Sequence, residues 1–217
     1  MFADNYAFIC QPWLTNIVQP MKLILASTSP YRKLLLQKLQ IPFTCMAPEI
    51  DETPLPAEPA EKLVARLALA KAQATAEKIS DGFIVASDQV ASLNGNILGK
   101  PLHYPAAFKQ LRDCSGKIIT FHTGLCLFNA KTQQHKTIVE PFNVEFKSLS
   151  EQQIDRYLKI EQPYDCAGSF KSEGLGIVLF SALQGRDPNT LVGLPLIALI
   201  ELFSEMNIDI FEHVNAG

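Results

Sequence analysis

Residues 83–93 read FIVASDQVASL, and this stretch decides how the chain is interpreted. It opens with an apolar run to Ala86 that is typical of a buried β-strand. Polar residues then break the run, among them Asp88 and Gln89. A carboxylate at the end of a buried strand needs a cation, a metal or a helix N-terminus as partner. Because ligands collect at strand ends in α/β folds, Asp88 is a candidate for chemistry.

Predicted strands and helices alternate on both sides of this stretch. The assignments follow apolar periodicity, helix-capping residues and turn residues. The further predicted strands cover 23–26, 43–47, 118–128, 137–147 and 176–180, and the predicted helices cover 29–40, 60–79, 104–114, 150–160 and 194–203.

The connections between these elements are of two kinds. Asn94-Gly95 is typical of a two-residue hairpin turn, and 118–128 with 137–147 is typical of a long antiparallel hairpin. Other strands are separated by helices, as in crossover connections. The fold class predicted is therefore α/β, with a mixed sheet rather than a uniformly parallel one.

Composition excludes several classes of protein. The chain has 217 residues, 47% of them hydrophobic, which suffices for one sizeable core. Its formal net charge of -3 argues against a nucleic acid polymer as partner. Five cysteines without a CxxC pair indicate reduced thiols rather than a disulfide framework or a zinc site.

The start of the chain has neither the basic residues of a signal peptide nor an apolar run that could span a membrane. We therefore expect no membrane partner. A second methionine, Met21, opens the sequence MKLILAS. We expect residues 1–20 to be an N-terminal extension, 21–207 a single domain and 208–217 a C-terminal tail.

The turn ASTSPYRK, residues 26–33, joins the first predicted strand to the first helix. The free N–H groups and the dipole of a helix start favour an anion, and Arg32 adds positive charge there. On spacing alone an ordinary N-cap at Ser29 is the commoner case, and phosphate binding stays open beside it. No GxxxxGK[ST] or GxGxxG motif occurs, which excludes a P-loop and a dinucleotide fingerprint.

Two lysines and one carboxylate are further candidates for the same site. Lys71 falls in or beside the apolar stripe of the predicted helix 60–79, where a snorkelling lysine is the ordinary alternative. Lys100 is a loop lysine, and Glu52 belongs to a Pro-rich acidic loop, 48–59, which alone is typical of a solvated segment. Together with Asp88 and the first turn, they indicate metal-assisted phosphoryl chemistry.

The order of these motifs resembles a known family. The chain carries ASTSPYRK, PEIDE, Lys71, SDQV, GKP, AGSFKSEG and DPNTLVGLPL in the order seen in Maf-type nucleotide pyrophosphatases, from Met21 to Phe203. The resemblance implies a bilobed α/β fold, a mixed central sheet flanked by helices and an active-site cleft between the lobes. It also implies a divalent cation, Mg²⁺ or Mn²⁺, a small-molecule nucleotide substrate, a cytoplasmic location and a homodimer.

The resemblance further implies a role for each motif. Asp88 corresponds to the proposed proton acceptor, which takes the proton of the attacking water directly or holds the metal that activates it. Glu52 shares the metal with Asp88. The implied phosphate-binding residues are Ser27, Ser29, Arg32, Lys71 and Lys100.

SDQV and AGSFKSEG resemble the branch that hydrolyses 7-methyl-GTP to 7-methyl-GMP and pyrophosphate. The three specificity positions hold Tyr31, Gln89 and Glu173 here, whereas the dTTP/UTP branch carries Arg, Thr and Gln. Tyr31 is one departure, because the 7-methyl-GTP branch often has Trp there. The expected function is that of the 7-methyl-GTP branch. The alternatives are a dTTP/UTP pyrophosphatase and a non-catalytic nucleotide-binding regulator of cell division.

Overall fold

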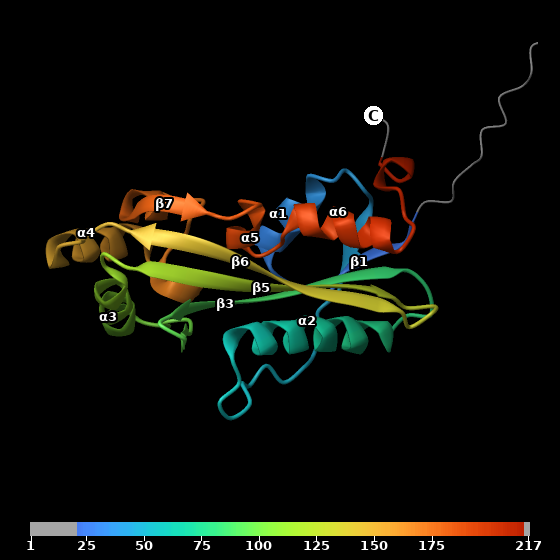
Figure 1. Ribbon diagram of the computed structural model, residues 1–217, viewed down its shortest axis with the longest axis horizontal. Coiled ribbons are helices and arrows are strands. Elements are labelled where there is room, and N and C mark those ends of the chain that lie inside the picture. The colour runs from blue at the N-terminus through green and yellow to red at the C-terminus, as the bar shows by residue number, and fades with distance from the viewer. Residues whose placement is uncertain (1–20, 215–217) are drawn as a thin grey trace, which may run out of the picture.

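The computed structural model describes residues 21–214. Residues 1–20, expected to be an N-terminal extension, and 215–217, the end of the expected C-terminal tail, lie outside the described residues. The described chain forms one mixed β-sheet with helices on both faces (Figure 1), which confirms the predicted fold class.

The sheet has seven strands and joins a short parallel part to a long antiparallel part. The strands are β1 (Leu23–Leu25), β2 (Phe43–Cys45), β3 (Phe83–Leu93), β4 (Asn96–Leu98), β5 (Ile118–Asn129), β6 (His135–Phe146) and β7 (Phe180–Gln184). Their order is β2-β1-β3-β5-β6-β7, with β4 paired to β3. β1 is parallel to β2 and β3, and the other pairings are antiparallel.

Helices begin where the sequence supplies caps. Ser29 caps the first helix, and Ser150 with Gln153 forms a capping box at the fourth. The helices are α1 (Pro30–Gln37), α2 (Ala60–Ala76), α3 (Tyr104–Cys114), α4 (Glu151–Glu161), α5 (Asn189–Val192) and α6 (Leu196–Glu205), and the 3₁₀ turns are η1 (Ala167–Ser169), η2 (Leu175–Leu179) and η3 (Ile210–Glu212).

The core is divided in two along the long strands. At one end, α2 covers one face of the sheet, and α1 and α6 cover the other. At the opposite end, α3, α4 and β7 surround a separate apolar cluster (Figure 1). β3, β5 and β6 run through both ends and tie them together. The expected bilobed arrangement is therefore confirmed.

One predicted strand was wrong. The predicted strand 176–180 is instead the 3₁₀ turn η2, and β7 begins only at Phe180. The chain is too tightly folded there to be extended, because the N–H of Gly176 donates to the carbonyl of Lys171 at 3.0 Å. The stretch 83–93 is one strand, β3, as the predicted hairpin at Asn94-Gly95 requires, so Asp88 lies within the strand and not at its end.

The pleat of β3 determines which way its residues point. Ile84 and Ala86 pack with α2, whereas Val85 packs with α6 on the other face. By this alternation Asp88 lies on the α2 face and Gln89 on the opposite face. Their hydrogen-bond partners confirm this, because Asp88 bonds to Lys71 of α2 and Gln89 bonds to Thr190 of α5.

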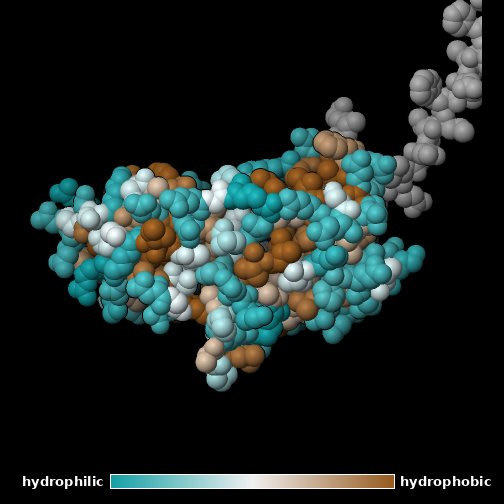
Figure 2. All heavy atoms as spheres, in the orientation of Figure 1, coloured by the Kyte–Doolittle hydropathy of each residue, from teal (hydrophilic) through white to brown (hydrophobic). Residues whose placement is uncertain are grey.

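The surface in Figure 2 is mostly hydrophilic, with apolar residues in scattered patches. Ile197 and Ile200 of α6 are among the exposed apolar side chains. Among residues 21–214, no helix has both the length and the apolar composition that crossing a membrane requires.

Candidate active site

A gap along one edge of β3 creates the central cleft. β1 pairs with β3 up to Val85, and β4 pairs with it only from Ala91 onward. The segment between them has no strand beside it on this edge in the described structure, whereas β5 pairs with it on the other edge. A ligand at this edge can therefore reach both faces of β3. This explains how neighbouring residues that point opposite ways line one cleft.

The cleft has a volume of about 590 Å³ and lies between the two lobes. Every site residue predicted from the sequence lines it, although these residues are distributed over more than half of the chain. They are Ser27, Ser29, Tyr31, Arg32, Glu52, Lys71, Asp88, Gln89, Lys100 and Glu173.

Lys71 links the two carboxylates of the cleft. It belongs to the buried stripe of α2, and its side chain is only 6% exposed, so the snorkelling alternative was wrong. Its Nζ lies 2.6 Å from Asp88 Oδ1 and 2.8 Å from Glu52 Oε1. The cation thus partners a buried charge that would otherwise be costly. Glu52 is more open, with 57% of its side chain exposed.

The turn at the start of α1 is a capped turn. Ser27 Oγ accepts the N–H of Ser29 at 3.1 Å, and Ser29 Oγ accepts the N–H of Arg32 at 3.4 Å. The capping interpretation of Ser29 is confirmed. Phosphate binding by this turn stays a prediction, and its place beside Lys71 and Lys100 in the cleft is compatible with it.

The side chain of Arg32 is held by Gly193, a residue far from it in the sequence. Its Nε donates to the carbonyl of Gly193 at 3.0 Å, and Ser87 Oγ donates to the same carbonyl at 2.8 Å. Burial lowers the pKa of the guanidinium, while Asp88 and Glu52 act in the opposite direction. Arg32 stays charged, because arginine does not lose its proton in proteins. One guanidinium edge is thus anchored, and the remaining N–H groups are left for an anion.

Gln89 lies on the face of β3 opposite to Asp88. Its Nε2 donates to the carbonyl of Thr190 at 2.7 Å and lies 2.9 Å from Thr123 Oγ1. These bonds attach the start of α5 to β3 and β5. Only the amide oxygen of Gln89 is left for a nucleotide base.

The far end of the cleft is aromatic and acidic. Tyr31 lies near Glu173 and Asp165, and burial is the main cause that raises the pKa of its hydroxyl, with both carboxylates acting in the same direction. Sequence reasoning missed several residues here. Phe170, Leu191 and Val192 belong to the AGSFKSEG and DPNTLVGLPL motifs, Asp165 and Cys166 directly precede the first of these motifs, and Phe121 lies in an ordinary strand.

Glu52 and Asp88 suit a divalent cation. Both offer hard carboxylate oxygens, and Mg²⁺ in phosphoryl-transfer sites commonly binds one or two carboxylates together with substrate phosphates. Within residues 21–214 there is no group of three or more His, Cys, Asp or Glu side chains that could hold a metal by itself. The donor set therefore fits a cation that binds together with a substrate rather than one caged by protein.

The fold and the cleft define a class: an α/β protein with a cationic and carboxylate site for a small polyanion beside an aromatic pocket. The chain belongs to the Maf-like protein family, whose profile matches residues 22–206.

Two curated relatives are similar to nearly the whole chain. A 7-methyl-GTP pyrophosphatase of Pseudoalteromonas atlantica is 61% identical over 194 residues, covering 89% of this chain and all of the relative. A 7-methyl-GTP pyrophosphatase of Nitrosococcus oceani is 57% identical over 186 residues, covering 86% of this chain and 94% of the relative. The Ham1 protein of Staphylococcus aureus has a solved structure with a TM-score of 0.48 and 14% identity, covering 86% of this chain and 99% of that one.

Proposed function

We propose that this chain is a nucleoside triphosphate pyrophosphatase that hydrolyses 7-methyl-GTP to 7-methyl-GMP and pyrophosphate. The observation that carries the reaction type is the contact of Lys71 with both Asp88 and Glu52 in a cleft that Arg32 and Lys100 also line. The choice of substrate is supported by the names of two relatives that are 61% and 57% identical to the chain.

Positive charge in the cleft suits a triphosphate. Arg32, Lys71 and Lys100 would offset the charge of the substrate and of the departing pyrophosphate. Arg32 is held by its bond to Gly193, so its free guanidinium edge is already oriented. Orientation of this kind before substrate arrives lowers the entropic cost of reaching the transition state.

Glu52 and Asp88 would hold a divalent cation, Mg²⁺ or Mn²⁺, together with the phosphates. When bound, such a cation supplies Lewis acidity and charge neutralisation at the phosphates.

Asp88 is the proposed proton acceptor. Water attacks the α-phosphorus, a new phosphorus–oxygen bond forms, and the bond from the α-phosphorus to the α–β bridging oxygen breaks. The bridging oxygen leaves with pyrophosphate, and the water proton passes to Asp88. Lys71 contacts Oδ1 of this carboxylate, and Asp88 also lines the cleft. A positioned carboxylate suits general base catalysis.

The aromatic and acidic end of the cleft is the proposed base pocket. N7-methylation makes guanine cationic, and the ring of Tyr31 can attract a cation. The carboxylate of Glu173 can accept hydrogen bonds from N1–H and the amino group of guanine. Asp165 adds a second negative charge near the same pocket.

Replacement of Glu173 by glutamine is expected to weaken the preference for 7-methyl-GTP over UTP. The neutral amide loses attraction for the cationic base and offers only one acceptor, a loss of about 1–3 kcal/mol, which is roughly 5- to 150-fold in the ratio of kcat/KM values. Measured kcat/KM for both substrates checks this. Asp113→Asn, a change on the exposed face of α3, serves as the control. An unchanged ratio in Glu173→Gln would refute the role of Glu173.

The test of the proposed function is a panel of 7-methyl-GTP, GTP, dTTP and UTP with detection of pyrophosphate and of the monophosphate, with and without Mg²⁺ or Mn²⁺. We expect metal-dependent turnover with the highest kcat/KM for 7-methyl-GTP. A higher kcat/KM for dTTP or UTP than for 7-methyl-GTP would favour the alternative function, a dTTP/UTP pyrophosphatase. Tight nucleotide binding without product would favour a non-catalytic regulator.

The proposal includes a homodimer, a cytoplasmic location and the removal of a modified nucleotide before it enters nucleic acid. The first two rest on the family resemblance, and the third follows from the proposed substrate.

A further inference from the structure

The loop 48–59 joins β2 to α2 and carries Glu52 into the cleft. It contains no helix or strand, so regular backbone hydrogen bonds do not hold it in place. Glu52 nevertheless lies 2.8 Å from Lys71 Nζ. The backbone of this loop must therefore be positioned by side-chain contacts.

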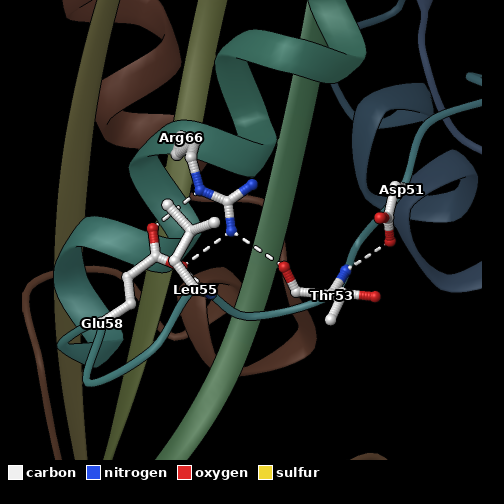
Figure 3. Close-up of polar contacts among 5 residues, drawn as sticks. All are labelled: Asp51, Thr53, Leu55, Glu58 and Arg66. Carbon is white, nitrogen blue, oxygen red and sulfur yellow. Dashed lines mark hydrogen bonds and ion pairs between the residues drawn. The ribbon is translucent and has the colours of Figure 1, made fainter.

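Arg66 of α2 supplies that contact (Figure 3). Its Nε and Nη2 each lie 2.7 Å from an oxygen of Glu58, in a two-pronged ion pair. Nη2 also donates to the carbonyl of Thr53, the residue after Glu52, at 3.2 Å. The Arg66 side chain therefore holds the loop next to Glu52 and again at Glu58, near the end of the loop.

Glu58 extends the same network. Its Oε2 accepts the N–H of Leu55 at 3.0 Å, and its side chain is only 7% exposed. Hydrogen bonding to Arg66 is the largest cause that lowers the pKa of Glu58 to about 2. Two-pronged arginine–carboxylate pairs fix geometry as well as charge, which a lysine cannot reproduce.

Arg66 and Lys71 belong to the same helix, which packs against the sheet beside Asp88. Lys71 contacts the Glu52 carboxylate itself, and Arg66 contacts the backbone of the next residue. The rigid helix thus sets the distance between these two contacts.

We propose that Arg66 is a positioning residue for catalysis, which holds Glu52 at the cleft through Thr53 and Glu58. This inference rests on the proposed function, since it assigns Glu52 a part in it. The ordinary alternative is a partly exposed ion pair that affects stability slightly and activity not at all.

The experiment compares Arg66→Ala, Arg66→Lys and the control Lys62→Ala, an exposed lysine of the same helix, in the full chain at saturating Mg²⁺. We expect both Arg66 variants to lower kcat for 7-methyl-GTP about 10- to 100-fold, the range typical of outer-shell partners. The KM should change less than kcat, because the groups that bind the base are untouched. Lys62→Ala should match the unsubstituted chain.

A double-mutant cycle separates positioning from general destabilisation. If Arg66 acts through Glu52, adding Arg66→Ala to Glu52→Gln should cause little further loss. Hydrogen exchange gives a readout that needs no activity. In Arg66→Ala the amides of Thr53 and Leu55 should exchange faster, while those in the middle of β3 stay protected.

Each outcome has a consequence. Normal kcat in both Arg66 variants, or a full additional loss on top of Glu52→Gln, would overturn the inference and leave the proposed function standing. Unchanged exchange in the loop would overturn it too. Absence of turnover by the unsubstituted chain would overturn the proposed function and this inference with it.

Discussion

Replacement of Asp88 by asparagine is expected to lower kcat by about 10²–10⁴-fold, the usual contribution of a positioned acid or base. Asparagine keeps the size of the side chain but cannot accept a proton. It also removes the ion pair with Lys71 Nζ at 2.6 Å, although Glu52 still partners that lysine. The fold should survive for this reason. Steady-state kinetics with 7-methyl-GTP and a circular dichroism spectrum measure the two effects.

The matched control is Asp113→Asn, which neutralises an acid of α3 that pairs with Lys109 outside the cleft. It should retain normal turnover. Near-normal kcat in Asp88→Asn would exclude Asp88 as the proton acceptor. A collapsed spectrum would mean that Asp88 is needed for folding, and Asp88→Glu, which keeps the charge, would then decide the chemical role.

Replacement of Gly124 by alanine is expected to destabilise the fold and disturb the site together. Gly124 lies opposite Asp88 in the β3–β5 register and beneath α2. An added Cβ would lie 2.2 Å from the carbonyl oxygen of Val64, which is backbone and cannot rotate away. The helix that carries Lys71 would have to move. Overpacking of this kind costs about 1–3 kcal/mol or more.

Urea unfolding measures the loss of stability, and about 2 kcal/mol would lower Tm by about 4–8 °C in a chain of this length. Gly99→Ala is the control for stability, because its Cβ would meet nothing within 4 Å. It should stay within about 0.5 kcal/mol of the unsubstituted chain. Equal stability of the two variants would show that α2 does not need the close approach to β5.

Much of the fold could be predicted from local patterns. The hairpin at Asn94-Gly95 and the long hairpin of β5 and β6 follow from turn residues and apolar alternation, and both are present. The strand predicted at 176–180 failed because a local apolar run does not reveal the turn that Gly176 makes with Lys171. Short apolar segments are ambiguous without their partners.

For the candidate site too, the sequence predicted one part and the structure revealed another. Motif order selected ten of the residues that line the cleft, from Ser27 to Glu173. It did not reveal that Lys71 is buried between two carboxylates, that Gly193 anchors Arg32, or that Arg66 holds the loop of Glu52. Each of these contacts joins segments whose separation in space is set by packing rather than by spacing in the sequence.

The stretch FIVASDQVASL shows where this limit lies. By itself the sequence determined that a strand passes here and that a carboxylate and an amide interrupt its apolar run. Only the tertiary structure decided what the two side chains contact: Asp88 pairs with Lys71 on one face of the strand, and Gln89 bonds to Thr190 on the other. Both reach one cleft because β1 stops and β4 starts on either side of them, leaving one edge of β3 open. Such a gap depends on the lengths and registers of neighbouring strands, and these are properties of the assembled sheet.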